Sequence, residues 1–149
     1  MGTRASRPHG AGWLTSTMAH LVEISVEESW DLLGSHSVCR VAWAGSDGPV
    51  VLPLNYVVHD HTLWLRTSAH STISQEIDDD QLAILVDEFD AETQVGWSVQ
   101  VRGVAEVHYG TEGVPEEVTE TLRTWATGPR PLWIKVTTTA VNGRRLPEE

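Results

Sequence analysis

Residues 96–109 read GWSVQVRGVAEVHY, and this segment says more about the fold than any other. Its apolar residues Trp97, Val99 and Val101 alternate with other side chains, which is the period of a β-strand with one buried face. The alternation breaks at Gly103 and then resumes. A glycine inside a strand commonly marks a bulge or a close approach of another backbone. The segment therefore predicts a long strand with an irregularity near its middle.

Five other segments have the β-branched and apolar composition of strands. They are residues 37–44, 50–58, 62–67, 82–89 and 133–139. Turn-forming residues separate the first three, namely GSDGP at 45–49 and HDH at 59–61. Short strands joined by tight turns form antiparallel meanders, so we expect six strands in antiparallel arrangement.

Three short helices are predicted beside the strands. Ser25 and Glu28 form a capping box ahead of an apolar stripe, which predicts a helix over residues 26–34. A second helix is predicted from residue 71 or 72 to residue 80, and a third over residues 116–126. Six strands with short flanking helices give an α+β fold that is mostly β and forms a barrel or a curved sheet.

The chain of 149 residues is long enough for one domain with its own core. Residues 1–19, rich in Gly, Ser and Arg, are predicted to be a flexible N-terminal arm, and residues 20–149 to be the folded domain. The arm lacks the apolar core of a signal peptide, and no apolar run approaches the roughly 20 residues of a membrane span. We therefore expect a soluble, cytoplasmic protein with no membrane partner.

The charge balance argues against a nucleic-acid partner. The chain carries 21 acidic and 10 basic residues, for a formal net charge of -11 at pH 7. Phosphate backbones are bound by clustered Lys and Arg. Here there is a single lysine, Lys135, and the only adjacent cations are Arg144 and Arg145. These two are interpreted as a solvated tail, with a role near the phosphate of a bound cofactor as the alternative.

Residues that commonly carry chemistry are sparse. Cys39 lies in an apolar run, where a lone cysteine is expected to be a small core residue and not a nucleophile. His59 and His61 lie at a predicted turn without nearby Cys or Glu, so no metal site is predicted. A Ser–His–Asp triad assembles from distant positions and stays open, although no nucleophile elbow supports one.

Seven segments, taken in chain order, share a pattern with one protein family. They are SVEESWDLL (25–33), CRVA (39–42), VLPLNY (51–56), LWLRT (63–67), VDEFD (86–90), GWSVQVRGVA (96–105) and NGRRL (142–146). In order and spacing they resemble small actinobacterial-type members of the pyridoxamine 5'-phosphate oxidase-like family. The resemblance spans about residues 21–146. It implies a six-stranded antiparallel split β-barrel that forms a homodimer and binds flavin mononucleotide (FMN) in a cleft at the dimer interface.

The resemblance also implies which residues bind the cofactor. Residues 53–55 are expected to pass along the flavin ring, and residues 65–68 to line the ring edge and the ribityl chain. Trp97 and Ser98 are expected to approach from the other subunit. The full set of implied FMN-binding residues is Arg40, Pro53, Leu54, Asn55, Leu65, Arg66, Thr67, Ser68, Ser71, Thr72, Trp97 and Ser98.

Several of these residues also have a purely structural interpretation. Trp97 is equally a candidate for the core. Arg66 and Arg102 are candidates for surface ion pairs in an acidic protein. Pro53 inside a strand fits an edge position whether or not a ligand lies there.

One position departs from the family pattern. The family usually has Gly-Thr-Lys-Leu after the Arg-Thr pair, and its lysine pairs with the cofactor phosphate. Here residues 70–73 read HSTI, so Thr72 replaces the lysine. A hydrogen bond to a charged group contributes about 1.5–3 kcal/mol, so we expect phosphate binding to be weaker by roughly tenfold to a hundredfold. Ser71, Thr72 and the amides at the start of the next helix remain as phosphate donors.

Four functions are compatible with the sequence. The first is an FMN-dependent oxidoreductase of unidentified substrate, in which the cofactor carries the chemistry. The alternatives are a non-catalytic flavin-binding or storage module, a deazaflavin-dependent reductase, and a dimeric barrel without a cofactor. The deazaflavin reductase is disfavoured because its anionic cofactor needs a basic groove, which the sequence does not reveal. A true pyridoxamine 5'-phosphate oxidase is not expected, since basic residues for a substrate phosphate are not evident.

Overall fold

The computed structural model of the protein describes residues 20–68, 72–126 and 128–147, which form seven strands and three helices. The strands are β1 (Val22–Ile24), β2 (Val38–Gly45), β3 (Gly48–His59), β4 (Thr62–Thr67), β5 (Gln81–Asp90), β6 (Val95–Tyr109) and β7 (Leu132–Leu146). The helices are α2 (Val26–Gly34), α3 (Thr72–Glu76) and α4 (Glu116–Thr121). The predicted N-terminal arm, residues 1–19, lies outside the described residues.

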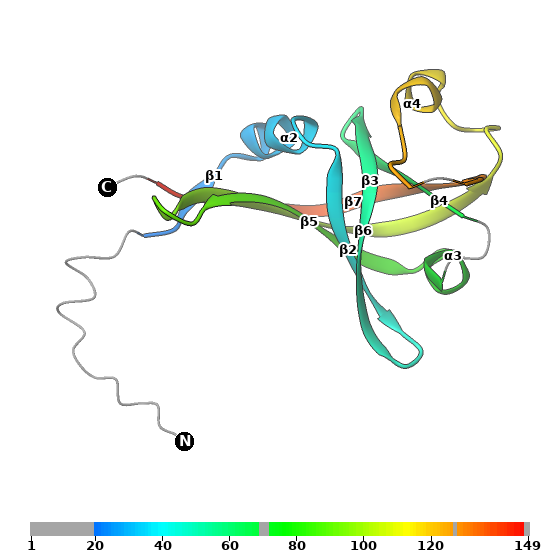
Figure 1. Ribbon diagram of the computed structural model, residues 1–149, viewed down its shortest axis with the longest axis horizontal. Helices are drawn as coiled ribbons and strands as arrows, with labels where there is room; N and C mark the ends of the chain where they lie inside the picture. The colour runs from blue at the N-terminus through cyan, green and yellow to red at the C-terminus, as the bar shows by residue number, and fades with distance from the viewer. Residues whose placement is uncertain (1–19, 69–71, 127, 148–149) are drawn as a thin grey trace.

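All seven strands belong to one antiparallel sheet with the order β1-β7-β4-β3-β2-β5-β6 (Figure 1). β6 also pairs with β7, and this pairing closes β2 to β7 into a barrel. The predicted α+β, mostly β fold is confirmed, and the six predicted strands are the six strands of the barrel. β1 is a seventh strand, which the sequence analysis missed because three residues are too few to show a period.

The last strand is longer than the sequence predicts. β7 continues to Leu146, so the interpretation of Arg144 and Arg145 as a solvated tail is wrong. Arg144 pairs with Ser98 of β6, and Arg145 pairs with Trp97. The sequence hides this extension because the second half of β7 is polar and does not alternate; its backbone pairing with β6 holds it in the sheet.

Two helices are shorter than predicted. α4 ends at Thr121 and not at residue 126, because the backbone of Leu122 is already extended, with ψ of 104°. α3 also ends early, ahead of a turn in which Asp79 has a positive φ of 62°. Because α4 ends early, the segment between α4 and β7 is a loop. This loop contributes to the site described below.

Helix α2 begins with the predicted cap. The N–H of Glu28 donates to Ser25 Oγ at 3.0 Å. The Glu28 carboxylate forms an ion pair with Arg145 of β7 in place of the second half of the capping box. Trp30 and Leu33 lie on the buried face of the helix. The cap, the ion pair and the apolar face together fix α2 against the end of the barrel where β1 joins β7 (Figure 1).

Apolar side chains fill two separate clusters. The larger fills the barrel and includes Val41, Leu63, Ile84, Val99 and Ile134, all with no exposed surface. The smaller lies outside the barrel, beneath α4. It consists of Trp64, Val114, Val118, Leu122 and Trp133. Because this second cluster anchors α4 on the outside of β4 and β7, it also positions the loop that follows α4.

Cys39 is the core residue that the sequence predicts. It is fully buried, and burial raises the pKa of its thiol to about 12. A thiol that ionises near pH 9 when unfolded thus stays protonated in the native state. The unfolded state therefore releases a proton that the native state keeps, and the free energy of unfolding is expected to fall as pH rises from about 9 toward 12.

We expect native protein at pH 8 to react with a thiol reagent on the order of a thousandfold more slowly than the same protein in denaturant, since the thiolate is the nucleophile. The rate of carboxymethylation by iodoacetamide, followed by mass spectrometry, measures this. Equal rates in the two conditions would mean that Cys39 is accessible and ionised in the native protein.

Candidate functional site

The barrel opens where β3 and β4 separate. Their pairing ends at Tyr56 and Leu65, and from there toward its beginning β3 pairs only with β2. Pro53 lies in this stretch and has no N–H to donate to a neighbouring strand, which fits the edge position that the sequence predicts. A pocket of about 240 Å³ lies at the opening. Its lining residues are Pro53, Leu54, Asn55, Arg66, Thr67, Ser68, Thr124, Ala126 and Arg130.

Six of the twelve predicted FMN-binding residues come together in this pocket, from two segments of the sequence: residues 53–55 of β3 and residues 66–68 at the end of β4. Leu65 is adjacent, but its side chain is fully buried in the barrel, so only its backbone faces the opening region. Thr72 begins α3, and Ser71 lies outside the described residues.

The other three predicted residues lie elsewhere on the sheet. Arg40 is the register partner of Pro53 and lines the neighbouring hollow on the outside of the barrel. Trp97 is 8% exposed and packs edge-on against His36, which agrees with its interpretation as a core residue. Ser98 lines a third hollow on the outer face of β6. Within one chain, therefore, Trp97 and Ser98 do not line the pocket at the opening.

Asn55 holds the loop that covers one side of the pocket. Its side-chain Nδ2 donates to the carbonyl of Ser37 at 3.2 Å, and its Oδ1 accepts from the backbone N–H of Trp125 at 2.9 Å. The Trp125 ring is left 74% exposed beside the pocket. Both ends of the Asn55 amide thus serve the structure, and one amide hydrogen and one lone pair of Oδ1 remain for a ligand.

Arg66 is held at the pocket wall by two contacts. Its Nε donates to the carbonyl of Arg130 at 2.8 Å, and its guanidinium carbon lies 4.5 Å from the centre of the Trp133 ring. The cation–π contact and the hydrogen bond fix the guanidinium plane while leaving its terminal N–H groups for a ligand. Among the described residues, no carboxylate forms an ion pair with Arg66.

Thr67 supplies a hydroxyl to the same pocket. The residue is 5% exposed, and its hydroxyl makes no hydrogen bond to another residue in the described part of the chain. The Thr67 hydroxyl oxygen is not among the fully buried polar atoms without a partner, so it is accessible from the pocket. Its position on the pocket wall indicates that the partner is a bound molecule or solvent.

Three lining residues were missed by the sequence analysis. Thr124, Ala126 and Arg130 come from the loop between α4 and β7. The apolar spacing that predicted a helix to residue 126 concealed the first two. The sequence segment around Arg130, between Pro129 and Pro131, could have been read as an extended, exposed turn, but nothing local to it indicates a site.

The outer face of the barrel continues from the pocket across five strands. Pro53 pairs with Arg40, Arg40 with Leu85, Leu85 with Gln100 and Gln100 with Asn142. Register partners point to the same face of a sheet, so these side chains form one row. A second row beside it contains Val51, Ala42, Ala83, Arg102 and Ala140.

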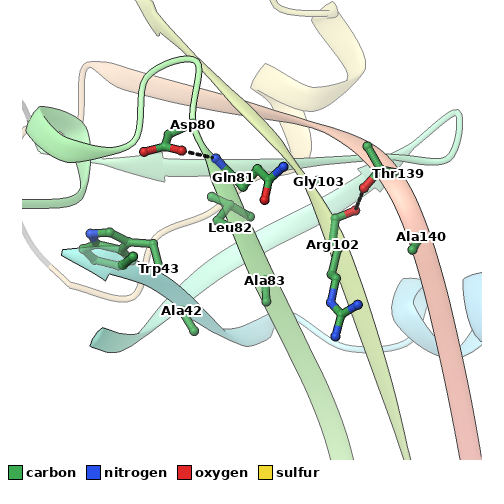
Figure 2. A pocket seen from close by; sticks show the side chains of 11 residues that line it. Ala42, Trp43, Asp80, Gln81, Leu82, Ala83, Arg102, Gly103, Thr139 and Ala140 are labelled. Carbon is green, nitrogen blue, oxygen red and sulfur yellow. Dashed lines mark hydrogen bonds between the residues drawn. The ribbon is translucent and has the colours of Figure 1, made fainter. Parts of the chain in front are cut away.

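Three shallow hollows lie along these two rows. The largest is about 540 Å³, and Figure 2 shows Ala42, Ala83 and Ala140 on neighbouring strands within it, with the Arg102 side chain between the last two. The others are about 250 Å³ and 260 Å³. Leu85, 37% exposed, is shared by the two smaller hollows. The result is an outer surface on which small and apolar side chains alternate with polar and basic ones.

Three guanidinium groups lie on this outer surface, those of Arg40, Arg102 and Arg144. None of them forms an ion pair with a carboxylate of the described residues. Among the arginines of these residues, only Arg145 forms such a pair. The interpretation of Arg102 as a surface ion pair is therefore not supported. In a chain with a net charge of -11, the outer surface is a local basic region.

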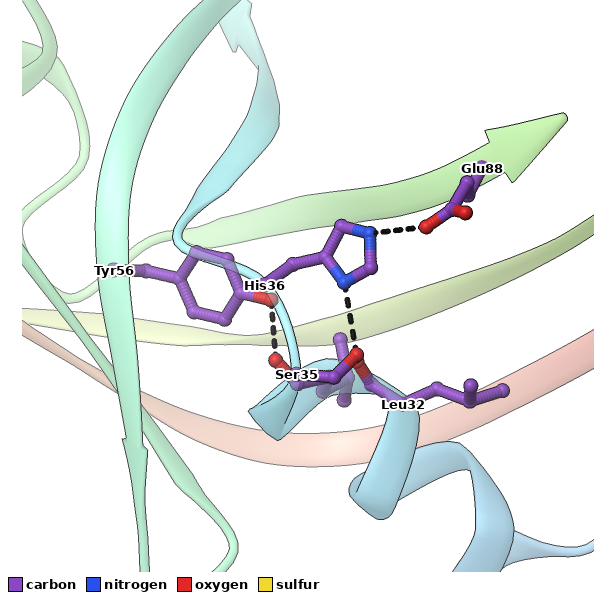
Figure 3. Close-up of polar contacts among 6 residues, drawn as sticks. Leu32, Ser35, His36, Tyr56 and Glu88 are labelled. Atoms are coloured by element: carbon purple, nitrogen blue, oxygen red, sulfur yellow. Dashed lines mark hydrogen bonds and ion pairs between the residues drawn. The ribbon is translucent and has the colours of Figure 1, made fainter.

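A cluster around His36 lies at another part of the molecule. The Nε2 of His36 lies 2.9 Å from Glu88 Oε1, and its Nδ1 lies 2.8 Å from Ser35 Oγ (Figure 3). The Ser35 hydroxyl donates to the carbonyl of Leu32 at 2.7 Å, so its proton is directed away from the imidazole. A catalytic triad needs the opposite arrangement, with the serine proton on the histidine side. The cluster instead ties the end of α2 to β5.

Two further features of the described residues bear on function. No group of three or more His, Cys, Asp or Glu side chains in them is arranged to hold a metal ion. None of their helices combines the length and the apolar character needed to cross a bilayer. The predicted turn at 59–61 is present, but His61 stacks on Trp30, with ring centres 4.6 Å apart.

A closed antiparallel barrel that opens where two strands part is a split barrel. Within that class, residues 25–145 match the model of the pyridoxamine 5'-phosphate oxidase family, and the chain belongs to this family. No match was found among curated protein sequences.

Several solved structures share the fold. The FAD-binding protein from Mycobacterium smegmatis is 27% identical, with a TM-score of 0.70 over 84% of this chain and 98% of that one. An FAD-binding protein from Mesorhizobium loti is 20% identical, with a TM-score of 0.62 over 85% and 97% of the two chains. A flavocytochrome from Azotobacter vinelandii is 12% identical, with a TM-score of 0.64 over 80% and 66%.

Proposed function

We propose that this protein binds FMN between two copies of the chain and uses it to oxidise or reduce a small molecule. The observation that carries the proposal is the pocket at the opening between β3 and β4. It places two arginines and an unpaired hydroxyl at one end of an apolar strand surface. The family match, and solved structures described as binding FAD, favour a flavin over other planar ligands.

The residues present fit the parts of a flavin. A flavin has a flat ring, a polyol chain and, in FMN, a terminal phosphate. Pro53 and Leu54 supply apolar surface for a ring, and Thr67 supplies a hydroxyl for a polyol or a phosphate. Arg66 and Arg130 supply positive charge for a phosphate. The donor set therefore fits FMN, and it fits the first phosphate of FAD equally well.

A second copy of the chain is part of the proposal because the pocket at the opening is too small to enclose a flavin. Pockets that enclose drug-sized ligands have volumes of about 300–1,000 Å³. The pocket at the opening has about 240 Å³, so a flavin seated there extends over the outer surface near Arg40 and Leu85. A second copy packed on this surface would cover the ring. In that arrangement Ser98 reaches the ligand from the other subunit, as the family resemblance implies.

The bound flavin supplies the electron transfer, and the chain supplies binding and orientation. The Arg66 guanidinium, fixed by Trp133, and the hydroxyl of Thr67 hold the ligand's polar end. Pro53 and Leu54 provide the surface against which the flat part packs. The loop held by Asn55 excludes water from one side of the pocket.

A deazaflavin is the second candidate ligand, and one observation favours it. The sequence analysis found no basic groove for the anionic tail of such a cofactor. The strand register nevertheless brings Arg40, Arg102 and Arg144 onto one surface. Titrations with FMN, FAD and a deazaflavin, read by quenching of tryptophan fluorescence, separate the candidates because Trp125 is exposed beside the pocket.

The test of the proposed function starts with protein as purified. We expect flavin absorbance, a dimer of twice 16.4 kDa by analytical ultracentrifugation, and bleaching by a reduced nicotinamide. A yellow protein that no physiological donor reduces would indicate a flavin-storage module. A colourless protein whose melting temperature does not rise with any flavin would contradict the proposal and leave a barrel without a cofactor.

The Thr72→Lys variant tests the departure from the family pattern. If the missing ammonium limits phosphate binding, the variant is expected to bind FMN about tenfold more tightly, because a hydrogen bond to a charged group is gained. Isothermal titration of the two proteins at the same ionic strength measures this. Equal affinities would show that the phosphate does not depend on position 72.

A further inference from the structure

We infer that Arg130 binds the phosphate of the flavin and provides, from the loop between α4 and β7, the positive charge that Thr72 does not. The inference rests on the proposed function. It concerns a residue that belongs to none of the seven short motifs, although it lies within the matched residues 25–145.

Arg130 lines the pocket at the opening of the barrel. It lies in the loop between α4 and β7. Its carbonyl accepts the hydrogen bond from Arg66 Nε at 2.8 Å, so the two residues are tied to one another at the pocket wall. The Arg130 side chain is partly buried, and its Nη1 donates to the carbonyl of Pro129 at 3.3 Å. The other terminal N–H groups remain for a ligand.

The residues that line the pocket bring positive charge to it. Two arginines, Arg66 and Arg130, line one pocket of about 240 Å³, and like charges at short range repel each other. Neither forms an ion pair with a carboxylate of the described residues, although the chain has 21 acidic residues to draw on. Two cations held together without a counter-charge are stabilised when an anion binds between them. A phosphate monoester, with a charge near -1.5 to -2 at neutral pH, matches two guanidiniums.

Thr67 also lines the pocket and carries a hydroxyl. The residue is 5% exposed, it follows Arg66 in β4, and its hydroxyl makes no hydrogen bond to another described residue. Phosphate oxygens accept hydrogen bonds from hydroxyl and guanidinium donors alike. The Thr67 hydroxyl is thus a further donor that a phosphate in this pocket can use.

The loop itself is built to hold Arg130 in place. The second apolar cluster anchors α4 through Val118 and Leu122, and Asn55 binds the loop at Trp125. The loop is thus fixed on both sides of its pocket-lining stretch, by Asn55 before Arg130 and by the Arg66 hydrogen bond at Arg130 itself. Arginine in this position also presents paired N–H donors, which suit a phosphate better than a single ammonium does.

The experiment compares FMN with riboflavin, which has the same ring and polyol but no phosphate. Arg130→Gln removes the charge and keeps the backbone carbonyl that Arg66 uses. Arg123→Gln is the matched control, because Arg123 is exposed on the same loop and does not line the pocket. The affinity of wild type and both variants for each flavin is measured by fluorescence titration, and the melting temperature verifies that each variant is folded.

We expect Arg130→Gln to weaken FMN binding by about tenfold to a hundredfold and to change riboflavin binding by less than about twofold. The FMN affinity of wild type is expected to depend on salt more steeply than that of Arg130→Gln. Arg123→Gln is expected to match wild type for both flavins. Equal FMN affinity in the two variants, or an equal loss for FMN and riboflavin in Arg130→Gln, would overturn the inference.

The same proteins separate this inference from the proposed function. If wild type binds neither flavin, the proposed function fails, and inorganic phosphate becomes the probe. Stabilisation of wild type and Arg123→Gln by phosphate, with none in Arg130→Gln, would then support the anion site by itself. Equal responses of all three proteins to phosphate would overturn it.

Discussion

Replacing Gly103 by alanine is expected to lower the free energy of unfolding by about 2–3 kcal/mol, the upper part of the range for overpacking a closed site. A Cβ atom on Gly103 would lie 2.5 Å from the carbonyl oxygen of Thr137 and 2.8 Å from Cγ1 of Val136. The first contact is with backbone, so a side-chain rotation cannot relieve it. Gly103 also marks the register shift between β6 and β7, as the broken alternation in the sequence predicted.

The effect is large because of where the contact lies. The β6–β7 pairing closes the barrel. Separating the two strands at Gly103 therefore disturbs the hydrogen bonds along this pairing. Gly34→Ala is the control, since a Cβ there has nothing within 4 Å. It is expected to stay within about 1 kcal/mol of wild type. Urea unfolding followed by tryptophan fluorescence gives both values. A Gly103→Ala variant as stable as Gly34→Ala would show that β6 and β7 can move apart enough to accept the added Cβ atom.

The parts of the fold that the sequence predicts are those that local patterns encode. The alternation at Trp97, Val99 and Val101 identified β6, and the Ser25 cap identified the start of α2. The polar half of β7 has no such pattern, because its place in the sheet depends on pairing with β6. A strand whose place depends on backbone pairing with a neighbouring strand cannot be predicted from the pattern of its own residues.

The candidate site was predicted in part for the same reason. Residues 53–55 and 66–68 were found through short motifs, and the structure brings them into one pocket. Arg130 has no motif, and it reaches the pocket only because α4 packs on Trp64 and Trp133 outside the barrel. The basic outer surface was missed because its arginines are far apart in the sequence and meet only through strand register.

Leu85→Lys is expected to convert the proposed dimer into a monomer and to weaken FMN binding at least about a hundredfold, although Leu85 does not line the pocket at the opening. Leu85 lies between Arg40 and Gln100 in the row that crosses the outer surface. A twofold interface presents each residue twice, so one substitution adds two ammonium groups. Each would be buried in a surface that already carries Arg40, Arg102 and Arg144 without counter-charges.

Within one chain the same substitution is mild. Leu85 is 37% exposed, and a like-charged cross-strand pair costs only about 0.2–1 kcal/mol. Loss of the dimer with a nearly unchanged melting temperature of the monomer would therefore locate the effect at the interface. Tyr109→Lys adds the same charge at an exposed position at the end of β6, and it is expected to leave both assembly and FMN affinity unchanged.

Sedimentation across a range of protein concentrations, combined with FMN titration, distinguishes the possible results. If two chains complete the site, FMN affinity in Leu85→Lys recovers as concentration restores the dimer, because binding and association are then linked. A monomeric Leu85→Lys that binds FMN as tightly as wild type would mean that one chain encloses the ligand by itself. The pocket of about 240 Å³ makes the linked result the expected one, since a ring that extends beyond it is covered only by a second sheet.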